Sequence, residues 1–229
     1  MTRLVIFDCD GTLVDSQAII TTAMERAFEA VGETPPERAE TLGIVGLSLP
    51  VAMVRLAPAA DDRTRTRLVD AYKQAFVALR SDAAFHEPLY PGARTVLDAL
   101  AADPGVTVAM ATGKSRRGVD AVLDHHSLHG IFASLHCADD GPSKPHPHMV
   151  HAAMENALAE AAHTVVIGDT TFDMEMAKAA GVSAIGVSWG YHPLEALEVH
   201  ADAVIDHFDA LPAALDSLLP FVSGTPNGQ

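Results

Sequence analysis

Short apolar runs divide the chain into a repeating pattern of strands and helices. Runs rich in β-branched residues recur, each followed by a polar or glycine-rich turn, at 4–7, 106–110, 163–167, 182–187 and 201–205. Apolar residues at helical spacing lie between them, at 92–103, 115–128 and 148–161. Strands that alternate with helices predict a parallel sheet covered on both faces, which is the doubly wound α/β class.

The segment 16–85 departs from this alternation. Apolar residues recur there at helical spacing, over 16–31 and 65–79, and no convincing strand separates them. The prolines and the glycine of HEPLYPG, residues 86–92, then interrupt regular structure before the next helix. We therefore predict two domains, namely a core formed by 1–15 and 86–229 and a helical cap domain inserted at 16–85.

The charge balance limits the kinds of partner. The 229 residues include 15 Lys and Arg against 30 Asp and Glu, which gives a formal net charge of −15. Nucleic acids and anionic membrane surfaces both need basic patches, so neither is expected as a partner. A small anionic substrate must then be attracted by a local positive site. These patterns leave the oligomeric state open.

Cysteine content and hydropathy predict the compartment. Cys9 and Cys137 are the two cysteines of the chain, too few for a disulfide framework. The start MTRLVIF lacks the features of a signal peptide, and no apolar run reaches the ~18 residues that cross a bilayer. We expect a cytoplasmic protein.

Two carboxylates directly follow the first predicted strand, in LVIFDCDGT. Asp8 and Asp10 are two residues apart, so on extended chain their side chains point the same way. Buried like charges are costly unless a cation lies between them. Gly11 allows the chain to turn sharply beside a ligand. This stretch therefore indicates a cation site.

Other polar residues follow the neighbouring strands. Thr112 and Gly113 come after the strand at 106–110, Asp169 and Asp173 come after the strand at 163–167, and Lys144 lies in PSKPHP. Ligands of open α/β sheets bind beyond the carboxyl ends of the strands. We therefore expect these side chains to converge with the first carboxylates on one edge of the sheet.

This set of residues suits phosphoryl transfer with a magnesium ion. Asp8, Asp10 and Asp169 offer the oxygen ligands that Mg²⁺ takes, and Asp173 is placed to bind a metal-bound water. With the charge cancelled, Asp8 can attack phosphorus to form an aspartyl-phosphate. Asp10 can protonate the leaving alkoxide and then deprotonate water.

The transferring phosphoryl group needs donors and positive charge around its oxygens. Thr112, the backbone N–H groups beside it at Gly113, and Lys144 are the predicted donors, with Gly11 at the turn beside the ligand. The predicted catalytic residues are Asp8, Asp10, Thr112 and Lys144. The predicted substrate-binding residues are Gly11, Thr112, Gly113 and Lys144, and the predicted metal site comprises Asp8, Asp10, Asp169 and Asp173.

Four motifs in a fixed order carry a family resemblance. DCDGT at 8–12, Thr112, Lys144 in SKPHP and GDTTFD at 168–173 span the core from residue 4 to about 190. The chain resembles the haloacid dehalogenase superfamily, in its phosphoglycolate-phosphatase-like branch. The resemblance implies a Rossmann-like core, a helical cap after the first strand, and a Mg²⁺-dependent phosphatase with Asp8 as nucleophile and Asp10 as acid/base. Gly113 departs from the family, where asparagine is common.

Several functions are compatible with these residues. Hydrolysis of a small phosphomonoester is favoured, with 2-phosphoglycolate as the first substrate and short sugar phosphates or pyrophosphate next. A β-phosphoglucomutase-like phosphosugar mutase is the alternative, but similar mutases carry a histidine shortly after DxDG and VDSQAII has none. Dehalogenase relatives lack the second aspartate, here Asp10. A receiver-type phosphoaccepting module is the non-enzymatic alternative, although receivers lack a large cap.

Several neighbouring residues have two interpretations. ATGKS at 111–115 is not a P-loop, because Val108 stands where that motif needs glycine. Lys114, Arg116 and Arg117 fit the solvated start of a helix better than a contact with an anionic substrate. The glycine-interrupted stretch 42–50 is either a packing turn or a loop that reaches the substrate.

Overall fold

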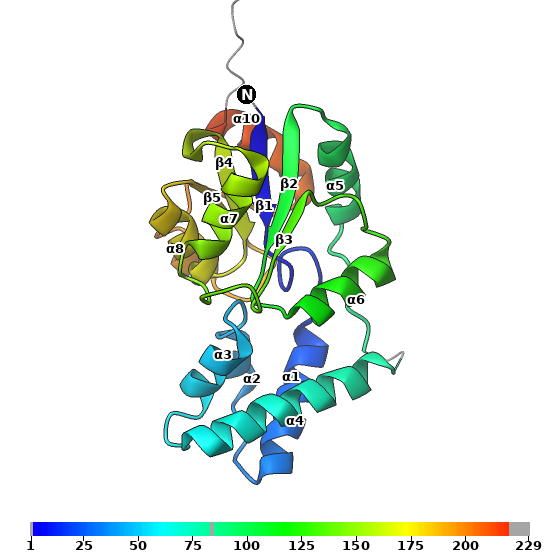
Figure 1. The fold of residues 1–229 in the computed structure, drawn as a ribbon, viewed down its shortest axis with the longest axis vertical. Coiled ribbons are helices and arrows are strands. Elements are labelled where there is room, and N and C mark those ends of the chain that lie inside the picture. The colour runs from blue at the N-terminus through cyan, green and yellow to red at the C-terminus, as the bar shows by residue number, and fades with distance from the viewer. Residues whose placement is uncertain (1, 83–84, 220–229) are drawn as a thin grey trace, which may run out of the picture.

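The computed structural model describes residues 2–82 and 85–219. Within this part of the chain, six parallel strands form one sheet in the order β3-β2-β1-β4-β5-β6 (Figure 1). The strands are β1 (Arg3–Phe7), β2 (Val106–Ala111), β3 (Ser134–His136), β4 (Thr164–Gly168), β5 (Ser183–Val187) and β6 (Ala203–Ile205). This is the strand order of a doubly wound nucleotide-binding-type sheet, and it confirms the predicted fold class.

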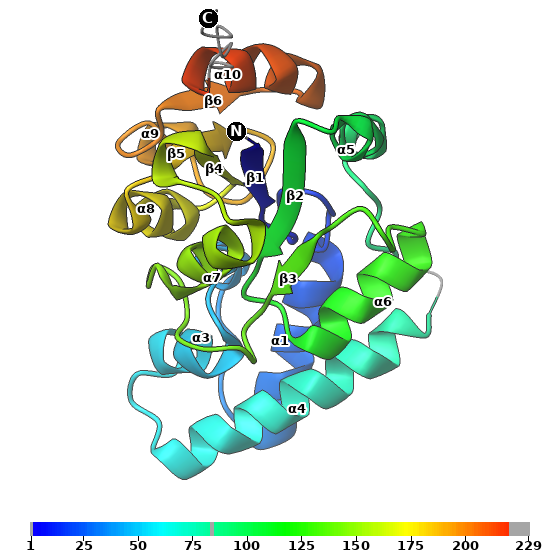
Figure 2. The ribbon, with the colours of Figure 1, turned by 45° about the horizontal axis from the view of Figure 1, so that its top comes forward.

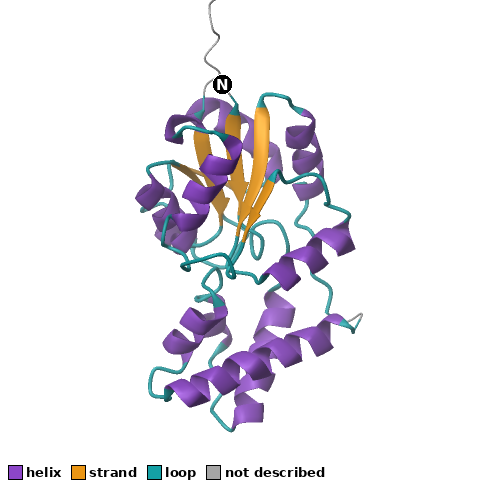
Figure 3. Cartoon of the chain, viewed as in Figure 1, coloured by secondary structure: helices purple, strands orange, loops and turns teal. Residues whose placement is uncertain are grey.

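Helices cover both faces of this sheet (Figures 1 and 3). The helices that pack around the sheet are α5 (Ala93–Ala102), α6 (Arg116–His126), α7 (His148–Ala157), α8 (Thr171–Ala180), α9 (Leu194–Leu197) and α10 (Leu211–Leu218). Two short 3-10 helices occupy Ala161–His163 and Phe208–Ala210. In Figure 2, α7 and α8 lie on one side of the strands and α5 and α6 on the other.

The two faces of the sheet carry separate apolar clusters. Along β1, Val5 and Phe7 belong to one cluster, whereas Leu4 and Ile6 belong to the other. Alternate side chains of a strand point to opposite faces, which explains this division. Helices α5, α6 and α10 contribute to the first cluster, and α7 and α8 contribute to the second. Burial on both faces is why the central strands are continuous apolar runs.

The five strands expected from the sequence are all present, with ends shifted by one or two residues. The sixth strand, β3, was not expected from its own residues. It has three residues, Ser134–His136, and only Leu135 among them is a large apolar side chain. This strand is held by its pairing with β2, in which Ala109 pairs with Ser134 and Ala111 with His136. Pairing of this kind cannot be predicted from the three residues of β3 alone.

Among the described residues between β1 and α5, the regular secondary structure is helical. The four helices are α1 (Gln17–Val31), α2 (Arg38–Leu42), α3 (Leu49–Leu56) and α4 (Asp62–Arg80). We call residues 17–80 the helical insertion. It lies beyond the end of the sheet toward which β1 runs (Figure 1). The exact division into a core and a cap at 15/16 and 85/86 stays a prediction.

The helical insertion has its own apolar core. Met24 and Phe28 of α1 pack with Met53 of α3 and Leu68 of α4. The two connections to the sheet lie side by side and are hydrogen-bonded. The Asp15 N–H donates to the Pro88 carbonyl at 2.8 Å, and the Tyr90 N–H donates to the Leu13 carbonyl at 2.9 Å. The two segments that join the insertion to the core, residues 13–15 and 88–90, are therefore paired by backbone hydrogen bonds. We call these two segments the paired stalk.

A matched pair of valine substitutions tests the placement of the core. Val5 is fully buried in β1, whereas the Val199 residue is 69% exposed. Val5→Ala removes two buried methyl groups and leaves a cavity, so the free energy of unfolding should fall by about 2–3 kcal/mol. Val199→Ala should change it by less than about 0.5 kcal/mol. Urea unfolding followed by circular dichroism measures both, and equal losses would contradict the assignment of β1 to the core.

Candidate active site

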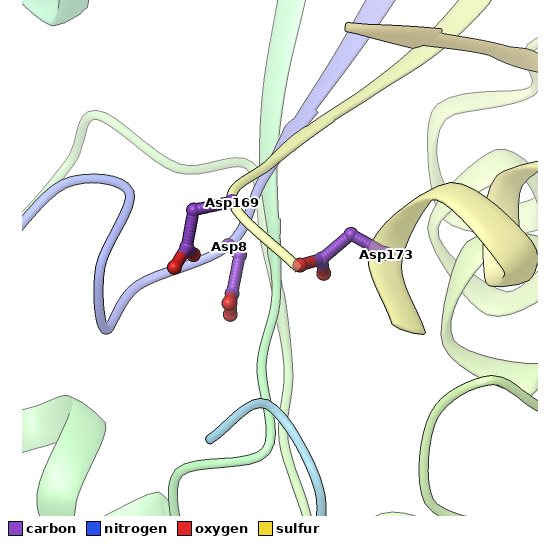
Figure 4. Close-up of side chains that lie close together, drawn as sticks. All are labelled: Asp8, Asp169 and Asp173. Atoms are coloured by element: carbon purple, nitrogen blue, oxygen red, sulfur yellow. The ribbon is translucent and has the colours of Figure 1, made fainter. Parts of the chain in front are cut away.

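Three buried aspartates meet at the carboxyl ends of β1 and β4. Asp8 follows β1, Asp169 follows β4, and Asp173 lies in the first turn of α8 (Figure 4). Each offers one carboxylate oxygen within 4.8 Å of the others. These two strands are neighbours at the point where the sheet order changes direction, and ligands of doubly wound sheets bind at that switch point.

Glycines allow this close approach. Gly11 has φ +84°, and a Cβ there would lie 2.2 Å from the Asp169 Oδ2. A Cβ on Gly168 would lie 2.3 Å from the carboxyl carbon of Asp173. Both positions therefore exclude a side chain, and at Gly11 the left-handed backbone conformation itself also favours glycine.

Hydrogen bonds orient two of the three carboxylates. The Asp169 carboxylate accepts from Thr12 Oγ1 at 2.9 Å and from the Tyr191 N–H at 2.9 Å. The Asp173 carboxylate accepts from Thr170 Oγ1 at 2.6 Å and from the Thr170 N–H at 3.1 Å, which completes a capping box at the start of α8. A helix N-terminus stabilises a carboxylate there.

Lys144 lies against two members of the cluster. Its Nζ is 2.6 Å from Asp173 Oδ1 and 2.8 Å from Asp8 Oδ1, and its side chain is fully buried. Burial by itself lowers the pKa of Lys144, but Asp173 and Asp8 outweigh it and raise this pKa above the ordinary value. The lysine is therefore an ammonium ion that compensates part of the negative charge.

Negative charge remains in excess at Asp8. Burial is the largest influence on its pKa, and with the repulsion of Asp173 it raises the pKa from 3.8 to about 7, although Lys144 lowers it. Burial, Asp8 and Asp173 likewise raise the pKa of Asp169 well above its ordinary value. Beyond its ion pair with Lys144, neither Asp8 oxygen accepts a well-directed hydrogen bond from the described residues. Buried carboxylate oxygens without donors fit a hard divalent cation such as Mg²⁺.

Asp10 lies apart from this cluster. Sequence reasoning grouped its carboxylate with those of Asp8 and Asp169, but the structure groups Asp173 with them instead. Asp10 Oδ1 accepts from Ser16 Oγ at 2.6 Å and from Lys114 Nζ at 2.7 Å. The strand ends at Phe7, so the alternation of side chains along extended chain no longer fixes the direction of Asp10.

A cavity of about 1040 Å³ connects these groups with the helical insertion. Asp8, Asp10, Thr112 and Gly113 line it on the core side. Gly11 and Lys144 are not among its lining residues, but Lys144 contacts Asp8, which is. The insertion contributes a mostly apolar wall, formed by Ile20, Met24, Ile44, Val45, Leu47, Leu49, Tyr72, Phe76 and Val77.

The stretch 42–50 reaches this cavity. Residues 44–50 line it, and the Ser48 N–H donates to Ser143 Oγ of the core at 2.8 Å. A Cβ on Gly113 would lie 2.4 Å from the Gly46 carbonyl oxygen. The loop backbone thus packs directly on Gly113, which gives a steric reason for glycine at this position.

Sequence reasoning missed the setting of Lys114. Instead of lying in solvent, its Nζ is buried 2.9 Å from Glu87 Oε1 and close to Asp10. Burial alone lowers the pKa of Lys114, but the two carboxylates raise it above the ordinary value. Its place two residues after Thr112 was a usable signal, whereas nothing in the sequence indicated Glu87. Arg116 pairs with Asp140 at 2.6 Å, and Arg117 is exposed at the cavity.

Buried carboxylates grouped beyond the carboxyl ends of β1 and β4 suit a hard divalent cation at the ligand-binding edge of the sheet. The sequence model of the haloacid dehalogenase-like hydrolase family matches residues 5–187. The chain therefore belongs to this family, which confirms the resemblance of its motifs.

Named relatives cover nearly the whole chain. A protein named probable phosphatase IndB from Dickeya dadantii is 36% identical over 97% of this chain and 97% of its own length. A phosphoglycolate phosphatase from Agrobacterium fabrum is 30% identical over 94% of this chain and 93% of its own length. The crystal structure of a hydrolase from Pseudomonas syringae has a TM-score of 0.83 at 25% identity and covers 95% of this chain and 99% of that one.

The stability of the protein in a chelator should depend on pH through Asp8. The unfolded carboxyl ionises near 3.8 and the folded one near 7. Between these values the folded state binds more protons, so this group's contribution to stability is lost as the pH rises. Asp8→Asn removes the effect. Its melting temperature should therefore exceed that of the wild type by more at about pH 8 than at about pH 5. Differential scanning calorimetry measures the two differences, and equal values would contradict the raised pKa.

Proposed function

We propose that this protein is a Mg²⁺-dependent phosphatase that hydrolyses a small phosphomonoester through an aspartyl-phosphate on Asp8. The observation that carries the proposal is the three-aspartate cluster with Lys144, which meets a large cavity at Asp8. A carboxylate nucleophile beside a cation site is one solution for phosphoryl transfer. Family membership and the names of the relatives support the same reaction class.

The metal would be held by Asp8, Asp169 and Asp173. Their oxygens lie within 4.8 Å of one another and are buried, and Lys144 neutralises only part of their charge. When bound, Mg²⁺ supplies charge compensation for the carboxylates and for the phosphoryl oxygens. Lys144, held as an ammonium ion beside Asp8, would add a second positive charge next to the nucleophile.

The bond changes can be assigned to residues of this chain. A carboxylate oxygen of Asp8 bonds to phosphorus as the bond from phosphorus to the alcohol oxygen breaks. Asp10 would enter this step in its protonated form, give its proton to the leaving oxygen and regain a proton from the attacking water. That water attacks the aspartyl-phosphate, which releases inorganic phosphate and restores the Asp8 carboxylate. Thr112 and the N–H of Gly113 would hold phosphoryl oxygens at the cavity.

The helical insertion would act as the predicted cap domain, residues 16–85. The loop of residues 44–50 touches the core at Gly113 and Ser143 and lines the same cavity as Asp8. An inserted segment in this position excludes bulk water from the reacting groups and admits one substrate. The paired stalk is where such a segment would hinge.

Two observations bear on the substrate. Relatives named phosphoglycolate phosphatase make 2-phosphoglycolate the first compound to test, with sugar phosphates and pyrophosphate next. The apolar wall from the insertion favours an organic group that is larger and uncharged. Its aromatic member Tyr72 offers contact surface to a ring. The panel should therefore extend to phosphomonoesters with ring-bearing alcohols.

We also propose that the protein is cytoplasmic. Both cysteines, Cys9 and Cys137, are free and buried, as is typical of a reducing compartment. Within residues 2–82 and 85–219, the search for a helix long and apolar enough to cross a bilayer found none. The proposed partner is a small phosphorylated metabolite, because the net charge of −15 disfavours nucleic acid.

Phosphate release tests this proposal. The wild type should release inorganic phosphate from one or more members of the panel with Mg²⁺, and a chelator should abolish the activity. Asp8→Asn should reduce kcat by more than about 10³-fold, because it removes the nucleophile with little change in shape. Lys178→Met, at a surface ion pair with Asp202, serves as a control and should retain activity. Folded protein that is inactive on the whole panel contradicts the proposal.

Product analysis separates the mutase alternative. The connection after Asp15 offers no histidine before α1, so we expect a hexose 1-phosphate to yield free sugar and phosphate. Formation of hexose 6-phosphate would instead assign the protein to the mutases.

A further inference from the structure

Lys114 has no role in the reaction described above, although it lies inside the site. Its Nζ is 2.7 Å from Asp10 Oδ1 and 2.9 Å from Glu87 Oε1, and its side chain is 7% exposed. The ammonium also lies over the ring of Phe76, 5.2 Å from the ring centroid. Phe76 belongs to α4, so this lysine contacts both the core and the helical insertion.

The contact continues into the insertion through Glu87. The second oxygen of this carboxylate, Oε2, accepts from Arg80 Nε at 2.9 Å and from Arg80 Nη2 at 2.6 Å. Arg80 is the last residue of α4. Asp10, Lys114, Glu87 and Arg80 therefore form a continuous chain of alternating charge, which begins at the predicted acid/base and ends on the insertion.

The balance of charge among these four side chains argues against a role for Lys114 in binding phosphate. When Asp10 is ionised, the charges of two carboxylates and two cations cancel, and the charged groups of Lys114, Asp10 and Glu87 are almost fully enclosed. A cation that already has two carboxylates within 2.9 Å offers little net attraction to a further anion. An interaction with Asp10 is what this geometry favours.

We propose that Lys114 is a positioning residue that orients Asp10 for proton transfer. Lys114 and Ser16 both bind Asp10 Oδ1, which fixes the plane of the carboxylate and leaves Oδ2 for the substrate. Glu87 and Arg80 make this orientation depend on the position of α4. The inference rests on the proposed function, because it assumes that Asp10 protonates the leaving group.

A comparison of leaving groups tests this role. p-Nitrophenyl phosphate releases a stabilised phenolate that needs little protonation, whereas an alkyl phosphomonoester depends on a general acid. For Lys114→Met, kcat should fall by roughly 10²–10³-fold on the best alkyl substrate of the panel and by less than about 10-fold on p-nitrophenyl phosphate. KM should change little for either. Glu87→Gln should show the same selectivity with a smaller loss.

Two further variants keep the test decisive. Lys114→Arg keeps the charge and should recover part of the alkyl activity, which also covers the case in which Lys114→Met does not fold. Lys178→Met, a lysine in a surface ion pair, should behave as the wild type on both substrates. Circular dichroism should verify that each protein is folded.

The contrary outcomes are distinct. Equal losses on the aryl and the alkyl substrate would indicate a purely structural role, and a raised KM with unchanged kcat would indicate that Lys114 binds substrate; either result overturns this inference alone. No turnover of any substrate by the wild type would overturn the proposed function and this inference with it.

Discussion

The rest of the site depends on the cost of burying like charges. Asp8, Asp169 and Asp173 bring three carboxylates within 4.8 Å of one another, and Lys144 is the ammonium that contacts two of them. All three carboxylates are buried, so their repulsion is weakly screened and protonation becomes easier. Burial, together with the repulsion of Asp173, raises the pKa of Asp8. A divalent cation would offset this repulsion, and the same cation would prepare the site for a phosphate group.

The fold meets this constraint through the strand order. Neighbouring β1 and β4 diverge in their later connections, so their carboxyl ends open a crevice where Asp8 and Asp169 face each other. Gly11 and Gly168 remove the side chains that would fill it. The helical insertion then closes the crevice from the other side. Its loop contacts Gly113, and a chain of ion pairs through Lys114 connects it with Asp10.

Much of this arrangement could be predicted because the motifs follow strand ends. The positions of Asp8, Thr112 and Asp169 after their strands were enough to place them on one edge. The direction of a side chain beyond the strand could not be predicted in this way. The Asp10 carboxylate lies outside the cluster that Asp173 forms with Asp8 and Asp169, although all four were predicted metal residues. The strand β3 depends on pairing with β2, and Lys114 depends on Glu87, which is 27 residues earlier in the chain. Such long-range contacts leave little local signal.

Calorimetric titration of Mg²⁺ into the wild type and into Asp169→Asn tests the central claim most directly. Asp169 accepts hydrogen bonds from Thr12 and Tyr191, which an amide can partly retain, so this variant should fold. The account predicts one Mg²⁺ bound per wild-type chain, and binding at least about 10-fold weaker in the variant because one ligand charge is lost. Absence of Mg²⁺ binding to the wild type, or equal binding to both proteins, would contradict the assignment of this cluster as a metal site.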